Sequence, residues 1–227
     1  MTEAAHHAGR NVQEISLIAV SKTFPLSDIQ IAMAAGQVDF GENRVEEALG
    51  KMAELAGKGE PQPRWHLIGH VQSRKARDAA GRFHLIHSVD SLKLAQKLNQ
   101  HCLPTMPQAI LLECNVSGEA SKDGFAVAGW ERDAAIRQAF FAQVEPLLTL
   151  PNLRVQGLMT IAPIVETPAQ ARPFFASLRA LRDALRERFP QTDWRHLSMG
   201  MTDDFQAAIA EGATLIRVGR AIFGNRG

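Results

Sequence analysis

Short runs of apolar and β-branched residues alternate with amphipathic segments along the whole chain. The runs predict strands, and the segments between them predict helices, because apolar positions recur there every three or four residues. The clearest helix follows residue 160: Thr167 and Pro168 stand at its start, and its apolar stripe is Phe174, Leu178, Leu181 and Leu185. We expect eight strands, over residues 16–21, 38–41, 65–69, 84–89, 109–116, 154–160, 194–199 and 214–219.

Eight strands that alternate with helices favour an α/β fold, a single (β/α)8 TIM barrel over residues 1–227. Repeated right-handed crossovers build a parallel sheet that can close on itself. A doubly wound open sheet is the alternative, but SKTFP follows the first strand where a dinucleotide-binding fold has a GxGxxG turn. Too few residues follow Gly219 for a full eighth outer helix, so we expect the segment before Ser16 to cover that gap.

Composition and charge narrow the class of protein. Hydrophobic residues make up 45% and charged residues 22% of the chain, as in proteins that fold around a core. The 25 basic and 24 acidic side chains nearly cancel, so the net charge gives no reason to expect nucleic acid or an anionic membrane as a partner. No apolar run approaches the roughly 18 residues of a membrane span, and we predict a cytoplasmic protein.

Cysteines and histidines indicate neither a disulfide framework nor a metal site. Cys102 and Cys114 form no CxxC pair. Glu42 and Glu46 are four residues apart, and we interpret them as neighbours on one helix that face solvent. Five histidines lie on different predicted strands, at mixed spacing and without acidic neighbours, which favours packing or surface roles: His66, His70, His84, His87 and His196.

The polar residues that end the predicted strands are the candidates for chemistry, because (β/α)8 barrels carry their sites at the carboxyl ends of the strands. Lys22 ends the first strand and Arg217 ends the last. These strands are neighbours in a closed barrel, and a nearby cation together with partial burial lowers the pKa of a lysine. A neutral Lys22 could form a Schiff base with a carbonyl. The alternative is a solvated lysine, or one that binds a phosphate as a point charge.

The loops after the last two strands could bind a phosphate. Ser198 offers a hydroxyl, Gly200 allows close approach of the backbone, and Gly219 opens a short helix whose N–H groups would face an anion. The alternative is that both glycines only make tight turns. A phosphate site beside a reactive lysine indicates pyridoxal 5′-phosphate (PLP). Arg217 would then contact the pyridine nitrogen and keep it unprotonated, which disfavours carbanion chemistry.

Seven ordered motifs make the chain similar to the pyridoxal phosphate homeostasis proteins, also called proline synthase co-transcribed proteins. They are AVSKTFP, FGENRVEE, WHLIGHVQSRK, NVSGEASKDG, GLMTIAP, HLSMGMTDDF and IRVGRAIFG. The resemblance implies a barrel like the N-terminal domain of alanine racemases, with PLP held on Lys22 as an internal aldimine. It also implies cofactor contacts from Asn43, Ser198, Met199, Arg217, Gly219 and Arg220.

The resemblance assigns a part of the cofactor to each contact. Arg217 is implied at the pyridine nitrogen, and Asn43 and Met199 beside the ring. Ser198 and the backbone around Gly219 and Arg220 are implied at the phosphate. Arg220 stands where many members of the family carry threonine, so its backbone N–H is the group expected to make this contact.

Three functions compete for this site. The first is a monomeric, non-enzymatic carrier that holds PLP for intracellular homeostasis, with apo-enzymes that need PLP as possible recipients. The second is an amino-acid racemase, which needs a base on each face of the substrate; related racemases use lysine and tyrosine, and this chain has no tyrosine. The third is a lysine aldolase or phosphate-sugar enzyme that uses Lys22 without a cofactor. The missing second base favours the carrier.

Overall fold

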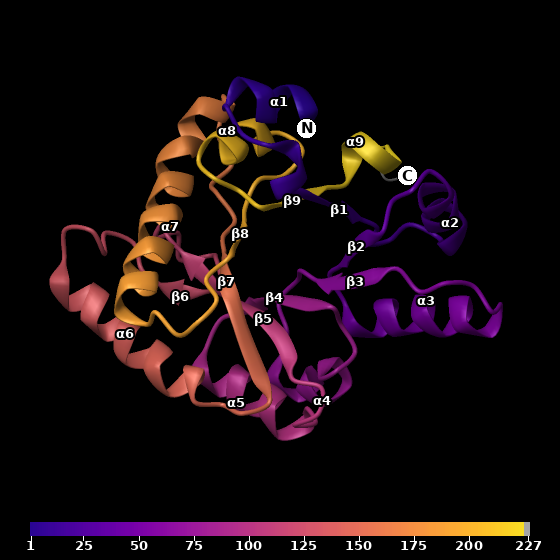
Figure 1. Cartoon of the computed structure of the whole chain (residues 1–227), viewed down its shortest axis with the longest axis horizontal. Helices are drawn as coiled ribbons and strands as arrows, with labels where there is room; N and C mark the ends of the chain where they lie inside the picture. Colours follow the sequence, from indigo (N-terminus) through magenta and orange to yellow (C-terminus); the bar gives the residue numbers. More distant parts are fainter. Residues whose placement is uncertain (225–227) are drawn as a thin grey trace.

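Eight parallel strands close into a barrel in the computed structural model, which describes residues 1–224 (Figure 1). Each strand pairs with its neighbours along the chain, β1 pairs with β9, and β4 pairs with β5. A further short strand, β6 (Phe125–Ala126), extends the pairing beside β5. The barrel strands are β1 (Ser16–Val20), β2 (Asp39–Glu42), β3 (Arg64–Leu67), β4 (Leu85–Val89), β5 (Gln108–Asn115), β7 (Leu153–Met159), β8 (His196–Ser198) and β9 (Leu215–Val218). The (β/α)8 prediction is confirmed.

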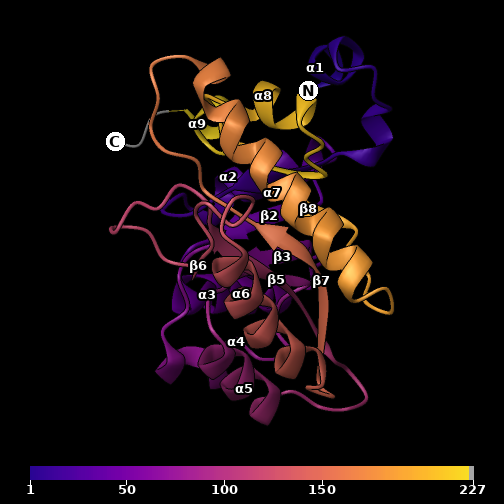
Figure 2. The same cartoon turned by 90° about the vertical axis from the view of Figure 1, so that its left-hand side faces the viewer.

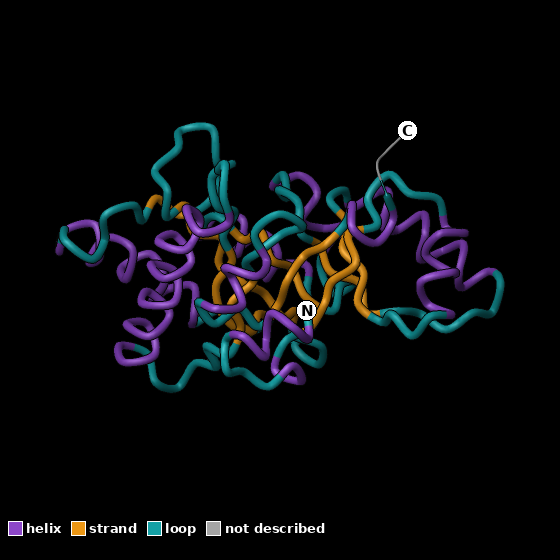
Figure 3. Tube along the Cα trace, turned by 90° about the horizontal axis from the view of Figure 1, so that it is seen from above, coloured by secondary structure: helices purple, strands orange, loops and turns teal. Residues whose placement is uncertain are grey.

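Helices surround the barrel, as the view from above shows (Figure 3). Those that connect consecutive strands are α2 (Leu26–Ala34), α3 (Val45–Gly57), α4 (Ala76–Ala79), α5 (Leu92–His101), α6 (Ala134–Leu148), α7 (Pro168–Arg188) and α8 (Phe205–Ala210). Short 3-10 turns, η1 (Val12–Glu14) and η2 (Ser73–Lys75), precede β1 and α4. Figure 2 shows α5, α6 and α7 along one side of the barrel.

Helix α7 starts where the sequence predicts. Gln170 accepts a hydrogen bond from the backbone N–H of Thr167 at 3.1 Å, and Pro168 fills the first helical position, where no N–H is needed. The buried stripe differs in one residue from the prediction, because Phe175 is buried and Phe174 is only half-buried. Phe175 lies four residues after the buried Ala171, so it continues the same face of the helix.

The N-terminal segment completes the outer layer beside the last strands. Helix α1 (Thr2–His7) packs against α8, next to which it lies in Figure 1. Arg10 donates hydrogen bonds to the carbonyl oxygens of Ile209 at 3.1 Å and Ala213 at 2.6 Å, at the end of α8. Helix α9 (Arg220–Phe223) is a single turn after β9, and α1 lies beside α8 in the outer layer.

Two apolar cores hold the fold. The larger lies between the strands and the surrounding helices, and a smaller one fills part of the barrel interior with Ile18, Leu85, Leu111, Met159 and Leu215. Successive residues of a strand point to opposite sides of the sheet, so every second residue faces the barrel interior. Several of these inward positions are polar, and they lead to the carboxyl ends of the strands.

Two further expectations concern the chain as a whole. Within residues 1–224, no helix has the length and apolar character that crossing a membrane requires. Cys102 and Cys114 are both buried and free.

Candidate functional site

A cavity of about 650 Å³ opens at the carboxyl ends of the barrel strands. Five of the seven residues predicted for the site line it together: Lys22, Asn43, Arg217, Gly219 and Arg220. The other two, Ser198 and Met199, are completely buried and are not among the lining residues. Residues from the predicted first, second and last strands therefore meet at one cavity.

Lys22 lies half-buried in the turn that follows β1. Its neighbour Thr23 has a φ of 69°, in the left-handed region that branched residues rarely adopt. The backbone N–H of Thr23 donates a hydrogen bond to Glu47 Oε1 at 2.6 Å, which holds the turn in this conformation. Backbone strain of this kind persists only where the surroundings fix it, and here the hydrogen bond to Glu47 does so.

A buried ion network supports this turn from below. Lys51 Nζ donates hydrogen bonds to Glu42 Oε1 at 2.8 Å, to Glu47 Oε1 at 2.8 Å and to the carbonyl oxygen of Ser21 at 2.9 Å. Ser21 Oγ also donates to Glu42 Oε1, at 2.6 Å. Both residues that flank Lys22 are thus tied to one ammonium group, Ser21 directly and Thr23 through Glu47.

Glu42 corrects the interpretation made from spacing. It ends strand β2 and is completely buried, whereas Glu46 is exposed on α3, so the two do not share a helix or a solvent-facing surface. Burial raises the pKa of Glu42, although the hydrogen bonds from Lys51 and Ser21 act in the opposite direction. Burial acts to raise the pKa of Glu47 as well, but the hydrogen bonds from Lys51 and the Thr23 N–H outweigh it, so the pKa of Glu47 is lowered.

Arg217 presents a buried cation to the cavity. Its side chain rises from β9 and donates hydrogen bonds from Nη1 to Ser198 Oγ at 2.6 Å and from Nη2 to the carbonyl oxygen of Thr160 at 2.9 Å. Burial lowers the pKa of Arg217 to about 10, with Glu113 and Asp204 acting against the shift, so the group stays charged at neutral pH. Among residues 1–224, no carboxylate forms a salt bridge with it.

A chain of buried hydrogen bonds runs from Arg217 across the barrel interior. Ser198 Oγ lies 2.8 Å from His87 Nδ1, His87 Nε2 lies 2.9 Å from His66 Nδ1, and His66 Nε2 lies 2.9 Å from Asp39 Oδ1. A guanidinium can only donate, so Ser198 accepts from Arg217 and donates onward to His87. The same logic lets each neutral imidazole donate to the next group until the Asp39 carboxylate accepts. Burial, with the positive charge of Arg217 adding to it, holds the pKa of His87 well below its ordinary value of 6.5.

The partner of His66 could not be read from sequence spacing. Asp39 and His66 are 27 residues apart in the chain but lie on the paired strands β2 and β3. Asp39 Oδ2 also accepts a hydrogen bond from Arg64 at 2.5 Å. Burial acts to raise the pKa of Asp39, but the hydrogen bonds from His66 and Arg64 outweigh this effect, so the pKa is lowered. The expected packing role of His66 and His87 therefore includes a polar support for Arg217.

The loops after β8 and β9 meet at one end of the cavity, where Met201, Thr202 and Asp203 join Gly219 and Arg220 in the lining. Gly200 has a φ of 92°, and a Cβ atom there would lie 2.6 Å from the Cβ of Ala208, so only glycine fits. The side chain of Arg220 pairs with Asp203 and joins the two loops. Its backbone N–H lies at the first position of α9, where a helix offers no internal acceptor.

The opposite side of the cavity is acidic, and the sequence interpretation missed it. Glu113 and Asp123 line the cavity together with His70. His70 Nδ1 lies 3.2 Å from Asp90 Oδ2 and 3.4 Å from Asp123 Oδ2. Glu113 is 7% exposed, and its buried Oε2 has no hydrogen-bond partner among the described residues. Burial, with Asp123 and Asp90 adding to it, raises the pKa of Glu113 to about 7.

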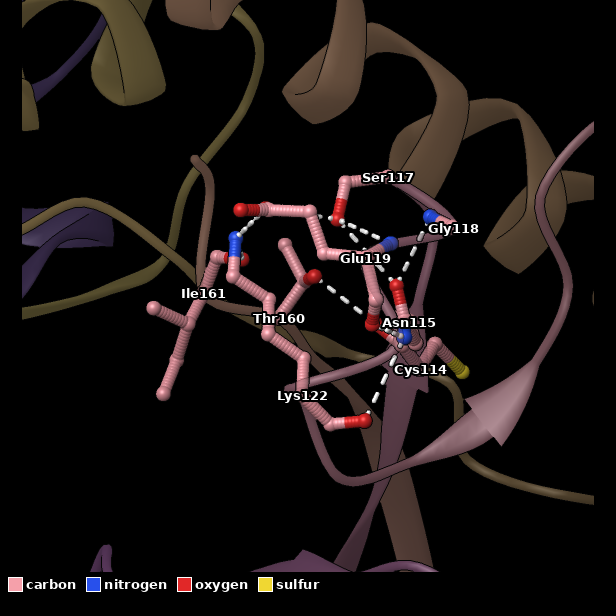
Figure 4. A network of polar contacts seen from close by, with 8 residues as sticks. All are labelled: Cys114, Asn115, Ser117, Gly118, Glu119, Lys122, Thr160 and Ile161. Atoms are coloured by element: carbon pink, nitrogen blue, oxygen red, sulfur yellow. Dashed lines mark hydrogen bonds and ion pairs between the residues drawn. The ribbon is translucent and has the colours of Figure 1, made fainter. Parts of the chain in front are cut away.

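The loop that carries Asp123 is held by its own polar contacts (Figure 4). The Asn115 side chain accepts from the N–H of Gly118 at 2.9 Å and donates to the carbonyl oxygen of Glu119 at 2.9 Å. Lys122 Nζ donates to the carbonyl oxygen of Ile161 at 3.2 Å and pairs with Glu119. One signal could have pointed to this side: Glu113 directly follows the apolar run AILL in the predicted strand AILLECNV.

Comparison with known proteins gives one consistent family. Residues 2–227 match the model of the alanine racemase N-terminal domain. A Pseudomonas aeruginosa protein named pyridoxal phosphate homeostasis protein is 45% identical over 226 residues, covering 99% of this chain and 90% of the relative. An Escherichia coli protein of the same name is 40% identical over 233 residues, covering 100% of this chain and 92% of the relative.

Solved structures agree with this assignment. PipY from Synechococcus elongatus is 39% identical, and its structures without and with PLP bound superpose with TM-scores of 0.84 and 0.80. In both cases the match covers 98% of this chain and 99% of PipY. Alanine racemase from Corynebacterium glutamicum, at 16% identity, shares the fold with a TM-score of 0.69 over 98% of this chain and 59% of the racemase.

Proposed function

Because the chain belongs to the family of pyridoxal phosphate homeostasis proteins, we propose that it binds PLP reversibly in the cavity at the carboxyl ends of the strands. PLP bound there supplies an aldehyde that condenses with a primary amine, and Lys22 is the lysine that lines this cavity. The protein would hold the cofactor for homeostasis and not turn over a substrate.

The residues around the cavity fit PLP. The observation that carries the proposal is Arg217, a buried cation in the cavity wall that has no salt bridge with a described carboxylate. An isolated buried charge is costly, so such a site favours a ligand that accepts its hydrogen bonds. Gly219 and the backbone N–H of Arg220 lie at the same cavity, where they suit a phosphate group.

The predicted site residues each have a role in this proposal. Lys22 holds the aldehyde as a Schiff base, and Arg217 donates to the pyridine nitrogen and keeps it unprotonated. Asn43 lines the cavity, and its contact with the ring stays a prediction. The Ser198 hydroxyl is shared between Arg217 and His87, so it orients the guanidinium. Contacts from Ser198 to the phosphate and from Met199 to the ring stay predictions.

A role without catalysis is supported by the names of the relatives and by the absence of tyrosine. Related racemases use tyrosine as the second proton carrier opposite the lysine, and this chain contains none. Cys114 is no substitute, because burial raises the pKa of its thiol. The predicted supply of PLP to apo-enzymes, the monomeric state and the cytoplasmic location belong to the same proposal.

The test is the visible spectrum of the purified protein with PLP, followed by borohydride reduction and intact mass. We expect a visible band, one PLP fixed per chain, and loss of both in Lys22→Ala. The matched control is Lys58→Ala, since Lys58 is an exposed lysine paired with Glu54. A protein that fixes no PLP, but fixes a sugar phosphate on Lys22, would instead be an aldolase.

A further inference from the structure

The acidic side of the cavity lies across from Lys22. In the barrel order, β5 is four strands away from β1 in either direction, so Glu113 on β5 and Lys22 after β1 are on opposite walls. We call Glu113, Asp90, Asp123 and His70 the acidic wall. Three carboxyl groups in it come from different parts of the chain: the end of β5, the residue after β4 and the loop before β6.

The acidic wall contains a group that lacks a partner. Glu113 is 7% exposed and therefore 93% buried. Its Oε2 has no hydrogen-bond partner among the described residues. It lines the same cavity as Asp123 and His70. Buried polar atoms in folded proteins almost always have partners, so a carboxyl group with one unpartnered oxygen, on a side chain that lines the cavity, indicates a ligand that donates hydrogen bonds.

The anionic phosphate of PLP cannot be the hydrogen-bond donor that Glu113 lacks. Phosphate would be repelled by Asp90, Asp123 and Glu113, and the loops after β8 and β9 offer it N–H groups elsewhere in the cavity. A cation with several N–H groups satisfies the wall best, because an ammonium offers three donors and neutralises the clustered negative charge.

We propose that the acidic wall binds the ammonium group of a second molecule, a primary amine such as a lysine side chain, and holds it across the cavity from Lys22. The inference rests on the proposed function, because it names the class of molecule that would meet PLP in this cavity. The binding is non-covalent and uses charge and hydrogen bonds from Glu113 and Asp123. A divalent cation on His70, Asp90 and Asp123 is the competing occupant, since their ligand atoms lie within 4.8 Å of one another.

The charge of the wall should depend on pH through Glu113. Its pKa is raised to about 7, so it is largely neutral in mildly acidic buffer and ionised in mildly alkaline buffer. The groups that face it are Asp90, Asp123 and Arg217, with His70 and Lys22 in the same lining. A primary amine stays protonated across this range. Amine affinity should therefore rise with pH through neutrality in the wild type and lose that rise in Glu113→Gln.

The experiment is isothermal titration of protein whose PLP has been fixed by borohydride, so that an added amine cannot react with the aldehyde. The probes are Nα-acetyl-lysine amide and Nα-acetyl-norleucine amide, which lacks the amine. We expect binding of the lysine probe only, weakened about tenfold in Glu113→Gln and in Asp123→Asn, as loss of a hydrogen bond between charged groups predicts. Glu145→Gln, at an exposed glutamate, is the matched control for the loss of one charge.

Three results would overturn the proposal. They are equal binding of both probes, undiminished binding of the lysine probe in a folded Glu113→Gln, and Mn²⁺ binding that excludes the amine and is lost in Asp90→Asn. Failure of borohydride to fix PLP would refute the proposed function instead. Titration of the cofactor-free protein with the same probes then tests the acidic wall separately.

Discussion

Replacing Lys51 with methionine should show how strongly the buried network supports the turn at Lys22. The Lys51 side chain is 10% exposed and its ammonium group contacts Glu42, Glu47 and the carbonyl oxygen of Ser21. Methionine keeps the length of the side chain and removes the charge. It leaves the Glu42 carboxyl, which is completely buried, without its counterion.

The size of the effect follows from burial. Removing one partner of a buried ion pair typically costs about 3 to 5 kcal/mol of the free energy of unfolding. Glu42 can limit this loss by taking up a proton, because burial already raises its pKa and loss of Lys51 raises it further. A carboxyl whose folded pKa is raised binds more protons in the folded state. The free energy of unfolding of Lys51→Met should therefore fall as the pH rises above about 4.3, the unfolded pKa of glutamate.

Urea unfolding at several pH values measures this effect, with Lys58→Met as the matched control. Lys58 forms an exposed pair with Glu54 one helical turn away, so its loss should cost only about 0.3 to 0.5 kcal/mol. The double variant Lys51→Met, Glu42→Gln should recover part of the stability and lose the added pH dependence. Equal losses in Lys51→Met and Lys58→Met, or a loss independent of pH, would refute the reasoning.

Three more substitutions test single features of the site. Ser198→Ala should lower the free energy of unfolding by about 1 to 3 kcal/mol in urea and speed PLP loss, because Arg217 and a buried histidine each lose a partner; unchanged PLP retention would contradict this. Thr23→Gly should raise the free energy of unfolding by up to about 1 kcal/mol, because glycine adopts a φ of 69° freely; a clear loss would count against strain at this turn. Gly200→Ala should cost about 2 to 4 kcal/mol, more than Gly59→Ala, since both glycines have positive φ but only Gly200 lacks space for a Cβ atom; equal losses would show that packing at Gly200 is loose.

The fold and one half of the site could be predicted because both depend on local patterns. Strand periodicity is read from adjacent residues, and all eight predicted strands are present. A residue that ends a parallel strand must lie at the same rim as the others, which is why the sequence alone placed Lys22 and Arg217 at one cavity, whereas Asn43 came from the family resemblance.

The other half depends on which residues of different strands and helices contact one another, and spacing along the chain does not contain that information. Glu42 shows the problem, because its partner Lys51 lies on the helix that follows it and its buried position depends on the register of β2. His66 and His87 are 21 residues apart, yet adjacent strands bring their rings within 2.9 Å. A shift of one residue in either strand would turn these side chains outward.

The interior of the barrel thus explains why Arg217 can remain in the cavity as a cation. Ser198 and Thr160 take two of its hydrogen bonds, and the chain through His87 and His66 ends at the carboxylate of Asp39 on β2. Each group in this chain accepts a hydrogen bond from the group before it and donates one to the group after it, until the carboxylate accepts the last. The guanidinium is therefore held in a single orientation without a counterion beside it. A carboxylate placed directly against Arg217 would orient it equally well but would occupy the donors that a ligand needs. The distant carboxylate leaves the remaining donors of the guanidinium for whatever fills the cavity.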